Sequence, residues 1–283
     1  MFLSFRRQIV NKNAMLQSFD LNGKTIVITG GLGQLGRQFT GALLAHGANV
    51  AALDLASGPG EAFDAHADAK HRLLYVRADI ADRKSLEQAL ETITERFGVP
   101  FGLVNNAALD APPGASAAEN GPFEDYPLAS WNKVMEVNAT GAFLACQVFG
   151  GAMAKAGRGS IANVSSIYGV VSPDQRIYEY RRKRGEMFFK PVAYSASKSS
   201  LLNLTRYLAT YWGARGVRVN TCVFGGVFNN QDEAFLEGYN AKVPLGRMAE
   251  ETEYNGAIVF LMSEASAYMT GAELVMDGGF TAW

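Results

Sequence analysis

A tyrosine and a lysine stand four residues apart in the run PVAYSASKSSLLNLTRYLATYW (191–212). If this run is helical, Tyr194 and Lys198 lie one turn apart on the same face. A free phenol titrates near pH ~10, and an adjacent ammonium stabilises the phenolate. We therefore predict that Lys198 lowers the pKa of Tyr194, so that the phenol transfers a proton near neutral pH. The alternative is a tyrosine that packs against the core beside a lysine whose head is in solvent.

Apolar runs alternate with helical patterns along the whole chain. The runs are TIVIT (25–29), NVAALD (49–54), RLLYVRAD (72–79), FGLVNNA (101–107), SIANVSS (160–166), GVRVNTCVF (216–224) and ELVMDGG (273–279). The helical patterns cover about residues 34–46, 84–97, 130–156, 191–214 and 251–262. Near-continuous apolar strands are typical of a sheet covered on both faces. The alternation predicts an α/β fold with a Rossmann-like, doubly wound parallel sheet of about seven strands and helices on both faces.

Composition indicates one large domain without a strong charge preference. The chain has 283 residues, of which 48% are hydrophobic and 19% charged, and its formal net charge is -1. This balance gives no field that would attract nucleic acid or an anionic membrane. Cys146 and Cys222 lie in apolar runs, which favours reduced, buried thiols in a cytoplasmic protein. The three histidines form no ligand pattern, so we predict no metal site.

The N-terminal segment does not resemble a signal peptide. Its two arginines are followed by no apolar h-region, and no apolar run reaches the ~18 residues that a membrane span needs. We therefore expect an N-terminal extension (1–19), a single catalytic domain (20–283) and no membrane contact.

A glycine-rich turn follows the first predicted strand directly. In TIVITGGLGQLGRQF, Gly31-x-Gly33-x-x-Gly36 opens a predicted helix. Glycines permit the tight turn and let the backbone approach a pyrophosphate, while the helix N-terminus offers free N–H groups. The predicted phosphate contacts are Gly30, Gly31, Gly33, Gln34, Leu35 and Gly36. A turn that serves only packing is the alternative.

An acidic residue ends the second predicted strand. Asp54 is placed to accept hydrogen bonds from both ribose hydroxyls of an adenosine, and it would repel a 2′-phosphate. Residues 55–57 supply no cation for such a phosphate. We therefore favour NAD over NADP, the alternative being a solvated acid at a strand end.

Taken in order, these and further motifs resemble the short-chain dehydrogenase/reductase family over residues 20–280. The motifs are TGGLGQLG (29–36), ADI (78–80), NNAA (105–108), VNATG (137–141), NVSS (163–166), YSASK (194–198) and MDGG (276–279). Each motif is only modestly specific, but the ordered set is highly specific.

The resemblance implies roles for the matching positions. Ser166 would polarise the substrate oxygen, Tyr194 would be the general acid/base, and Lys198 would bind the nicotinamide ribose. Asn138 would hold a water that touches Lys198. The cofactor would also contact Asp79, Ile80, Asn106, Ala107, Ala108, Gly225, Val227 and Asn229. Hydride exchange with a nicotinamide requires a proton to leave or join the substrate oxygen, which a tyrosine beside a serine supplies.

Two positions depart from the family pattern. Gln34 replaces the middle glycine of the usual cofactor turn, so the backbone path there should differ slightly. After the sixth strand, Phe224-Gly225 replaces the usual Pro-Gly, and Asn229 stands where a threonine often contacts the carboxamide. Asn229 still offers a donor and an acceptor.

An insertion is predicted over residues 170–193. Ser166 and Tyr194 are 28 positions apart, about twice the spacing common in the family. The insertion has six basic residues against three acidic ones, with aromatic residues interleaved. It fits either a solvated loop or subunit contact, or a lid that recognises an anionic substrate through arginine. Nucleic-acid binding has less support. The predicted substrate contacts are Ser166, Tyr168, Arg181, Arg182 and Arg184.

The motif environment narrows the expected chemistry. The stretches around residues 165–198 and 225–231 are similar to dehydrogenases of bacterial surface-sugar pathways, including legionaminic-acid flagellin glycosylation. We expect an NAD-dependent oxidoreductase that interconverts a secondary alcohol and a ketone of a sugar or sugar phosphate. The alternatives are a 3-oxoacyl-thioester or steroid-like ketone reductase, and an NAD-sensing regulatory protein without turnover. The family implies a homodimer or homotetramer, with contacts through the helices near 130–156 and 194–214.

Overall fold

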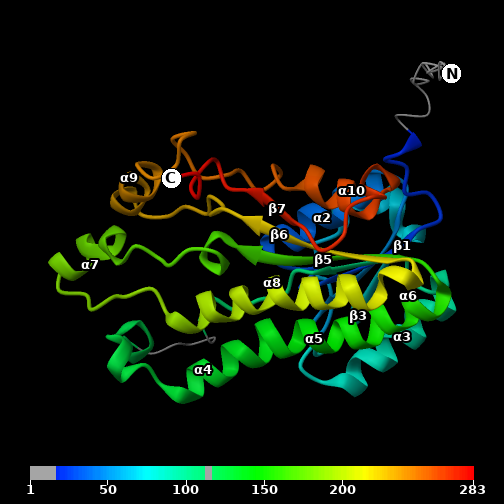
Figure 1. The fold of residues 1–283 in the computed structure, drawn as a ribbon, viewed down its shortest axis with the longest axis horizontal. Coiled ribbons are helices and arrows are strands. Elements are labelled where there is room, and N and C mark those ends of the chain that lie inside the picture. Colours follow the sequence, from blue (N-terminus) through cyan, green and yellow to red (C-terminus); the bar gives the residue numbers. More distant parts are fainter. Residues whose placement is uncertain (1–16, 112–116) are drawn as a thin grey trace, which may run out of the picture.

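The computed structural model describes residues 17–111 and 117–283 of the chain. Within them, one parallel seven-stranded sheet has the order β3-β2-β1-β4-β5-β6-β7 (Figure 1). The strands are β1 (Thr25–Thr29), β2 (Asn49–Asp54), β3 (Leu73–Arg77), β4 (Gly102–Asn105), β5 (Gly159–Ser166), β6 (Val217–Phe224) and β7 (Glu273–Met276). This confirms the predicted α/β fold. Most of the predicted N-terminal extension and part of the irregular segment after Asp110 lie outside the described residues.

The strand sequences explain why the sheet is covered on both faces. Every residue of β1, β4 and β5 is buried, as expected for β-branched runs without alternation. The chain builds β1 to β3 in one direction and then returns to place β4 on the other side of β1. Because the strand order reverses there, a crevice is expected at the carboxyl ends of β1 and β4.

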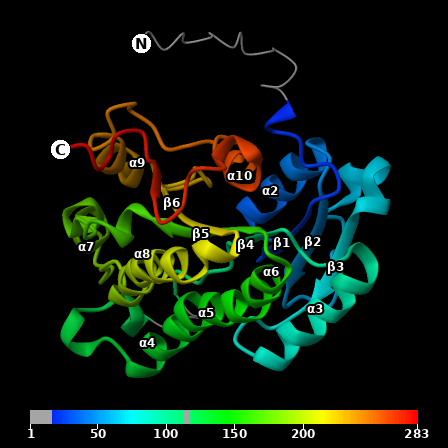
Figure 2. The same cartoon turned by 45° about the vertical axis from the view of Figure 1, so that its right-hand side comes forward.

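Helices form a layer on each face of the sheet (Figure 2). α2 (Gln34–Ala45) and α10 (Asn255–Met262) pack on one face, where Phe39 is fully buried. On the other face lie α3 (Arg83–Phe97), the α4–α6 run and α8 (Val192–Trp212). Gly150 permits close approach there, because a Cβ at this position would lie 2.5 Å from the Trp212 ring.

The helix predicted near 130–156 is one long run with two π-helical turns. It comprises α4 (Leu128–Met135), α5 (Ala142–Ala145) and α6 (Gly151–Ala156), joined by the turns Glu136–Gly141 and Cys146–Gly150. By length and composition this helix could cross a membrane, so the expectation that no run is apolar enough is wrong. Its apolarity has another cause, since 56% of its most apolar window is buried within the fold.

The predicted insertion covers the carboxyl ends of β5 and β6. It contains the short helical turn Gln175–Tyr178 and α7 (Glu179–Lys183), and it faces α9 (Glu233–Asn240), as Figure 1 shows. The Tyr178 ring joins the two segments. Its centroid lies 5.0 Å from that of Phe188 and 5.7 Å from that of Phe235.

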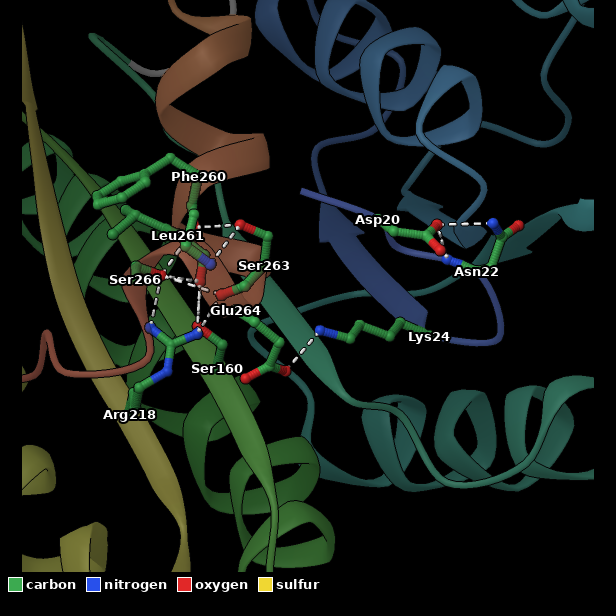
Figure 3. Close-up of polar contacts among 11 residues, drawn as sticks. Asp20, Asn22, Lys24, Ser160, Arg218, Phe260, Leu261, Ser263, Glu264 and Ser266 are labelled. Atoms are coloured by element: carbon green, nitrogen blue, oxygen red, sulfur yellow. Dashed lines mark hydrogen bonds and ion pairs between the residues drawn. The ribbon is translucent and has the colours of Figure 1, made fainter. Parts of the chain in front are cut away.

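A half-buried arginine, Arg218, connects β6 to the end of α10 (Figure 3). Arg218 donates to the carbonyls of Leu261 and Ser263 at 2.9 and 3.2 Å and to the Ser266 hydroxyl at 2.9 Å. The Ser160 hydroxyl on β5 donates to the same Leu261 carbonyl at 2.6 Å. The last carbonyls of a helix have no partner within the helix, and a cation there also complements its dipole. The sheet therefore supplies the cap of α10.

Candidate active site

Three side chains of the predicted catalytic set meet at one cavity. Ser166 is the last residue of β5, while Tyr194 and Lys198 lie one turn apart in the first turns of α8. All three line a cavity of about 340 Å³. The parallel sheet explains the meeting, because α8 packs against β5 and begins where that strand ends.

Lys198 is anchored through both its head and its backbone. Its Nζ donates to the Val164 carbonyl at 2.7 Å, and its own carbonyl accepts from the Ser165 hydroxyl at 2.8 Å. Only 3% of Lys198 is exposed. Its Nζ lies 5.8 Å from the centroid of the Tyr194 ring. The lysine is thus held beside the tyrosine by β5.

The predicted lowering of the Tyr194 pKa is not met in this structure. Burial raises the pKa of Tyr194 to about 12, and hydrogen bonding with the Ser166 hydroxyl offsets only part of this rise. Burial also lowers the pKa of Lys198, to about 8. The physical reason is that a low-dielectric site penalises the charged form of each group. The neighbours of the phenol could be predicted from the sequence, but its desolvation could not.

Asn138 lies next to the predicted catalytic residues and is held by three hydrogen bonds. It lies in the π-helical turn Glu136–Gly141, a geometry that often marks functional sites. Its amide nitrogen donates to the Leu109 carbonyl at 2.8 Å and to the Ser197 hydroxyl at 2.9 Å, and its oxygen accepts from the Leu109 N–H at 2.7 Å. The side chain therefore joins the segment after β4 to α8. Its role in holding a water near Lys198 stays a prediction.

The glycine-rich turn has the close approaches that a phosphate cradle needs. Gly30 has a φ of +64°, and a Cβ there would lie 2.8 Å from the Ala107 Cα. At Gly36 a Cβ would lie 2.1 Å from the Gly30 carbonyl oxygen. Gly33 is the N-cap of α2 and has no side chain to cap the helix. The first N–H groups of α2 are therefore available to an anion.

A second cavity, of about 430 Å³, extends from the glycine-rich turn to the ends of β2 and β3. Among the predicted cofactor residues it is lined by Gly30, Gly33, Gln34, Leu35, Asp54, Asp79, Ile80, Asn106, Ala107 and Ala108. Asp54 accepts from the N–H groups of Leu32 and Leu55 at 3.1 and 2.8 Å. The carboxylate is thus fixed at the rim of this cavity.

The two cavities adjoin and share one wall. Leu35, Asn106 and Ala108 line both. Asn106 is held by its amide nitrogen, which donates to the carbonyls of Thr29 and Gly30 at 3.2 and 3.1 Å. Together they make an elongated cleft along the carboxyl ends of the strands, with the glycine-rich turn at one end and Tyr194 at the other. This shape suits a dinucleotide whose nicotinamide end lies near the tyrosine.

Comparison with known proteins identifies the architecture. Residues 33–281 match the family described as "Enoyl-(Acyl carrier protein) reductase". The chain is 34% identical to D-threitol dehydrogenase of Mycolicibacterium smegmatis, with 93% of this chain and 95% of that protein covered. The chain belongs to the short-chain dehydrogenase/reductase family.

Other members of this family agree with the assignment. Cis-4-hydroxycyclohexanecarboxylate dehydrogenase of Sinomonas cyclohexanicum is 33% identical over 92% of this chain and 97% of its own length. A crystal structure of a short-chain dehydrogenase from Leptospira borgpetersenii with bound NAD+ is 32% identical, has a TM-score of 0.82 and covers 99% of this chain and 100% of its own. This member of the short-chain dehydrogenase/reductase family is therefore an NAD(P)-dependent enzyme that acts on a CH–OH group.

The segment after β6 forms the remaining wall of the dehydrogenase cavity. Gly225 and Val227 line it as predicted, but Asn229 is exposed and does not. Gln231 lines it instead. Its amide nitrogen donates to the Val227 carbonyl at 2.9 Å, and its oxygen accepts from the Asn229 N–H at 2.7 Å. Gln231 rather than Asn229 therefore faces the cavity, and the Asn229 contact with the carboxamide stays a prediction.

The insertion arginines of the dehydrogenase do not line the cavity, which contradicts their predicted role as substrate contacts. Arg181 pairs with Glu186 at 2.8 Å, and Arg184 pairs with Asp232 at 3.1 Å. Arg182 donates to the carbonyls of Phe188 and Gln175 at 2.8 and 2.9 Å. Arginine forks that bind nearby acceptors stabilise the segment itself. Tyr168, by contrast, is buried and lines the cavity as predicted.

Sequence reasoning missed several polar residues at the dehydrogenase cavity, among them Asp110, Lys190, Gln231 and Tyr239. One signal was available for Lys190, because it stands four positions before Tyr194 just as Lys198 stands four after it. The others come from distant segments and had no local pattern. The cavity is therefore rich in hydroxyl and charged groups.

Proposed function

We propose that this protein is an NAD-dependent dehydrogenase that interconverts a secondary alcohol and a ketone on a polyhydroxylated small molecule, such as a sugar or sugar alcohol. The observation that carries the proposal is the meeting of Ser166, Tyr194 and Lys198 in one cavity. Its cleft continues to the glycine-rich turn and Asp54.

Tyr194 and Ser166 have different roles in proton transfer. For alcohol oxidation, Tyr194 in its phenolate form accepts the proton of the substrate hydroxyl and becomes a neutral phenol, and Ser166 donates a hydrogen bond to the same oxygen. Lys198, whose Nζ lies 5.8 Å from the centroid of the Tyr194 ring, would hold the nicotinamide ribose. NAD, when bound, supplies the acceptor of the hydride that leaves the carbinol carbon. In ketone reduction the proton returns from Tyr194.

The cavity lining supports a hydroxylated substrate. Polar groups surround the reactive end, including the phenols of Tyr168, Tyr178 and Tyr239 and the Gln231 amide. Buried polar groups that must be paired favour a substrate that hydrogen-bonds to them and disfavour one that cannot. One relative of this chain, D-threitol dehydrogenase, is named after a polyol. A lid that binds phosphate through arginines is not part of the proposal, since those side chains are paired elsewhere.

Asp54 supports NAD over NADP. Its carboxylate lies on the cavity that leads from the glycine-rich turn, where it would accept the ribose hydroxyls and repel a 2′-phosphate. Arg77, in register with Asp54 on β3, donates to the Leu55 carbonyl at 3.2 Å and does not line the cavity. We expect Asp54→Ala to lower kcat/KM with NAD by about 10-fold or more. The ratio of kcat/KM with NAD to kcat/KM with NADP should therefore fall. An unchanged ratio would contradict this assignment.

A substrate screen with a tyrosine variant tests the activity. The absorbance of NADH would be followed over a panel of sugars, polyols and simple alcohols. Tyr194→Phe should lower kcat by about 100-fold or more, because general acid/base catalysis is lost, while NADH affinity stays within about threefold. Tyr207→Phe is the matched control, since Tyr207 is exposed on the same helix. Full activity of Tyr194→Phe would refute the mechanism.

Two alternatives give different results in the same screen. An acyl-thioester reductase would prefer NADPH and reduce acetoacetyl thioesters. A regulatory NAD sensor would bind NADH with no turnover of any substrate in the panel.

A further inference from the structure

An ion pair stands at the reactive end of the catalytic cavity. Lys190 Nζ lies 2.5 and 2.6 Å from the two carboxylate oxygens of Asp110. Both residues line the cavity that contains Ser166 and Tyr194. The Lys190 side chain is only 14% exposed, whereas that of Asp110 is 58% exposed. The Lys190 ammonium lies 5.1 Å from the centroid of the Tyr194 ring, closer than that of Lys198.

The insertion holds Lys190 in this place through its backbone. The Gln175 side chain accepts from the Lys190 N–H at 2.9 Å and donates to its carbonyl at 3.2 Å. Arg182 binds the carbonyls of Gln175 and Phe188, so it fixes both sides of the loop. The Phe189 N–H donates to the Asn120 carbonyl at 2.7 Å. Arg182, which stabilises the insertion, is therefore also a positioning residue for Lys190.

A stabilising role alone explains the pair poorly. An ion pair with one exposed partner contributes little to folding, and the scaffold already fixes the Lys190 backbone. The pair instead leaves hydrogen-bonding capacity in the cavity. An ammonium has three N–H donors, of which two suffice for the Asp110 oxygens, and a carboxylate accepts more than one hydrogen bond on each oxygen. A donor and an acceptor thus lie side by side near the reacting tyrosine.

We propose that Asp110 and Lys190 bind a second hydroxyl of the substrate, next to the carbinol that is oxidised, and so select a vicinal diol over a simple alcohol. The hydroxyl donates to the Asp110 carboxylate and accepts from the Lys190 ammonium. This rests on the proposed alcohol dehydrogenase function and deepens it.

A neutral substituent fits the pair better than an anionic one. The Asp110 carboxylate already neutralises Lys190 and would lie against any carboxylate or phosphate bound there. A hydroxyl satisfies both partners without breaking the ion pair. An anion would have to displace Asp110 from an ammonium that it contacts through both oxygens.

Matched alcohols that differ by one hydroxyl test the proposal. The probes are cis-1,2-cyclohexanediol against cyclohexanol and 2,3-butanediol against 2-butanol, each with saturating NAD. The wild type should favour the diols. Lys190→Met and Asp110→Asn should each lower kcat/KM for the diols by about 10- to 100-fold, the loss expected for a hydrogen bond to a charged group. The same variants should change kcat/KM for the simple alcohols by less than about threefold.

The control is a second ion pair on the same insertion. Lys183 and Glu179 are 3.8 Å apart on α7, exposed and outside the cavity lining. Lys183→Met and Glu179→Gln should leave the diol preference unchanged. Circular dichroism and NADH titration show that each variant is folded and binds cofactor. An effect transmitted through Tyr194 would change kcat/KM for both alcohols of a pair equally. The ratio of kcat/KM for the diol to kcat/KM for the simple alcohol therefore distinguishes a loss of hydroxyl binding from a loss of proton transfer.

Three results would overturn the proposal. One is a wild type that does not favour the diols, or that turns over neither alcohol of a pair. Another is an equal loss for diol and simple alcohol in Lys190→Met. The third is an Asp110→Asn variant that improves oxidation of 3-hydroxybutyrate while Lys190→Met abolishes it, since the lysine would then bind a carboxylate. The wider alcohol panel tests the proposed function separately. The proposed alcohol dehydrogenase function is refuted only if no alcohol in that panel is turned over.

Discussion

Burial sets the protonation of both ionisable groups in the catalytic pair. It raises the pKa of the Tyr194 phenol to about 12 and lowers that of the Lys198 ammonium to about 8. Both directions follow from the cost of a charge in a site with little water. A phenolate at Tyr194 therefore depends on the groups that contact it. Among these, Ser166 lowers the Tyr194 pKa and Asp110 raises it.

The lowered pKa of Lys198 predicts a specific pH dependence of stability. Below pH 8 the lysine is protonated in both folded and unfolded chains. Between pH 8 and the ordinary value of 10.5 only the unfolded chain keeps the proton, so raising the pH favours the folded state. Relative to Lys198→Met, the wild type should gain on the order of 1 kcal/mol of unfolding free energy per pH unit in this window. Urea titrations from pH 7 to 10 measure the difference.

A constant difference across that range would show that Lys198 has an ordinary pKa in the folded protein. The comparison is made between two variants of one chain, so the titration of other groups largely cancels. The Val164 carbonyl loses its partner in Lys198→Met, which shifts the difference at every pH without changing its slope.

Close packing in the glycine-rich turn determines which of its positions must be glycine. The turn brings the backbone of residues 30 and 31 against the first turn of α2, and at Gly36 no Cβ fits. At Gly33 the approach is wider, since a Cβ would lie 3.3 Å from the Gly30 oxygen rather than 2.1 Å. Two glycines of one motif thus serve different purposes. The first leaves room beside the cavity, and the second permits the packing of the turn itself.

This difference predicts unequal effects of alanine in the two positions. Gly36→Ala should destabilise the protein by about 2 kcal/mol or more, because the backbone must move, and should abolish NADH binding. Gly33→Ala should keep the fold and weaken NADH binding. Thermal unfolding and NADH fluorescence titration measure the two effects. Equal stability of the two variants would argue against this account of the turn.

The layers of the whole molecule are joined by polar contacts as well as by apolar cores. Arg218 links β6 to the end of α10, and Lys24 on the chain before β1 pairs with Glu264 at 2.8 Å in the same region (Figure 3). Removing a half-buried arginine that donates to several carbonyls takes away one of their hydrogen-bond partners, which costs free energy.

Arg218→Met should therefore lower the free energy of unfolding by about 2–4 kcal/mol. Arg215→Met, on an exposed residue close in the chain, should cost less than about 0.5 kcal/mol. Urea unfolding measures both, and kcat per folded molecule should be unchanged in each because neither residue lines the catalytic cavity. A midpoint for Arg218→Met equal to that of the wild type would disprove this role.

The oligomeric state of the whole molecule is predicted from its exposed side chains. Tyr207 and Tyr211 on α8 and Phe143 on α5 are exposed, and the two tyrosine rings stack with centroids 5.9 Å apart. We expect a homodimer or homotetramer that buries this face, because exposed apolar patches commonly mark interfaces. Light scattering on the eluted protein should give two or four chain masses, and Tyr207→Glu with Tyr211→Glu should reduce it. A monomeric wild type would contradict the prediction.

The sequence alone determined the strands, the glycine-rich turn and the spacing of Tyr194 and Lys198, whereas the place of Ser166 beside them was implied by the family resemblance. These features are local, since strand patterns, a helix four-residue spacing and a turn motif are each read from a few adjacent residues. Tertiary structure decided what lies across the cavity. Lys190 meets Asp110 from 80 positions away, Arg181 and Arg182 bind acceptors within the insertion, and Arg184 pairs with Asp232 outside it. The direction of the Tyr194 pKa shift was likewise decided by packing, because desolvation depends on every element that covers the phenol.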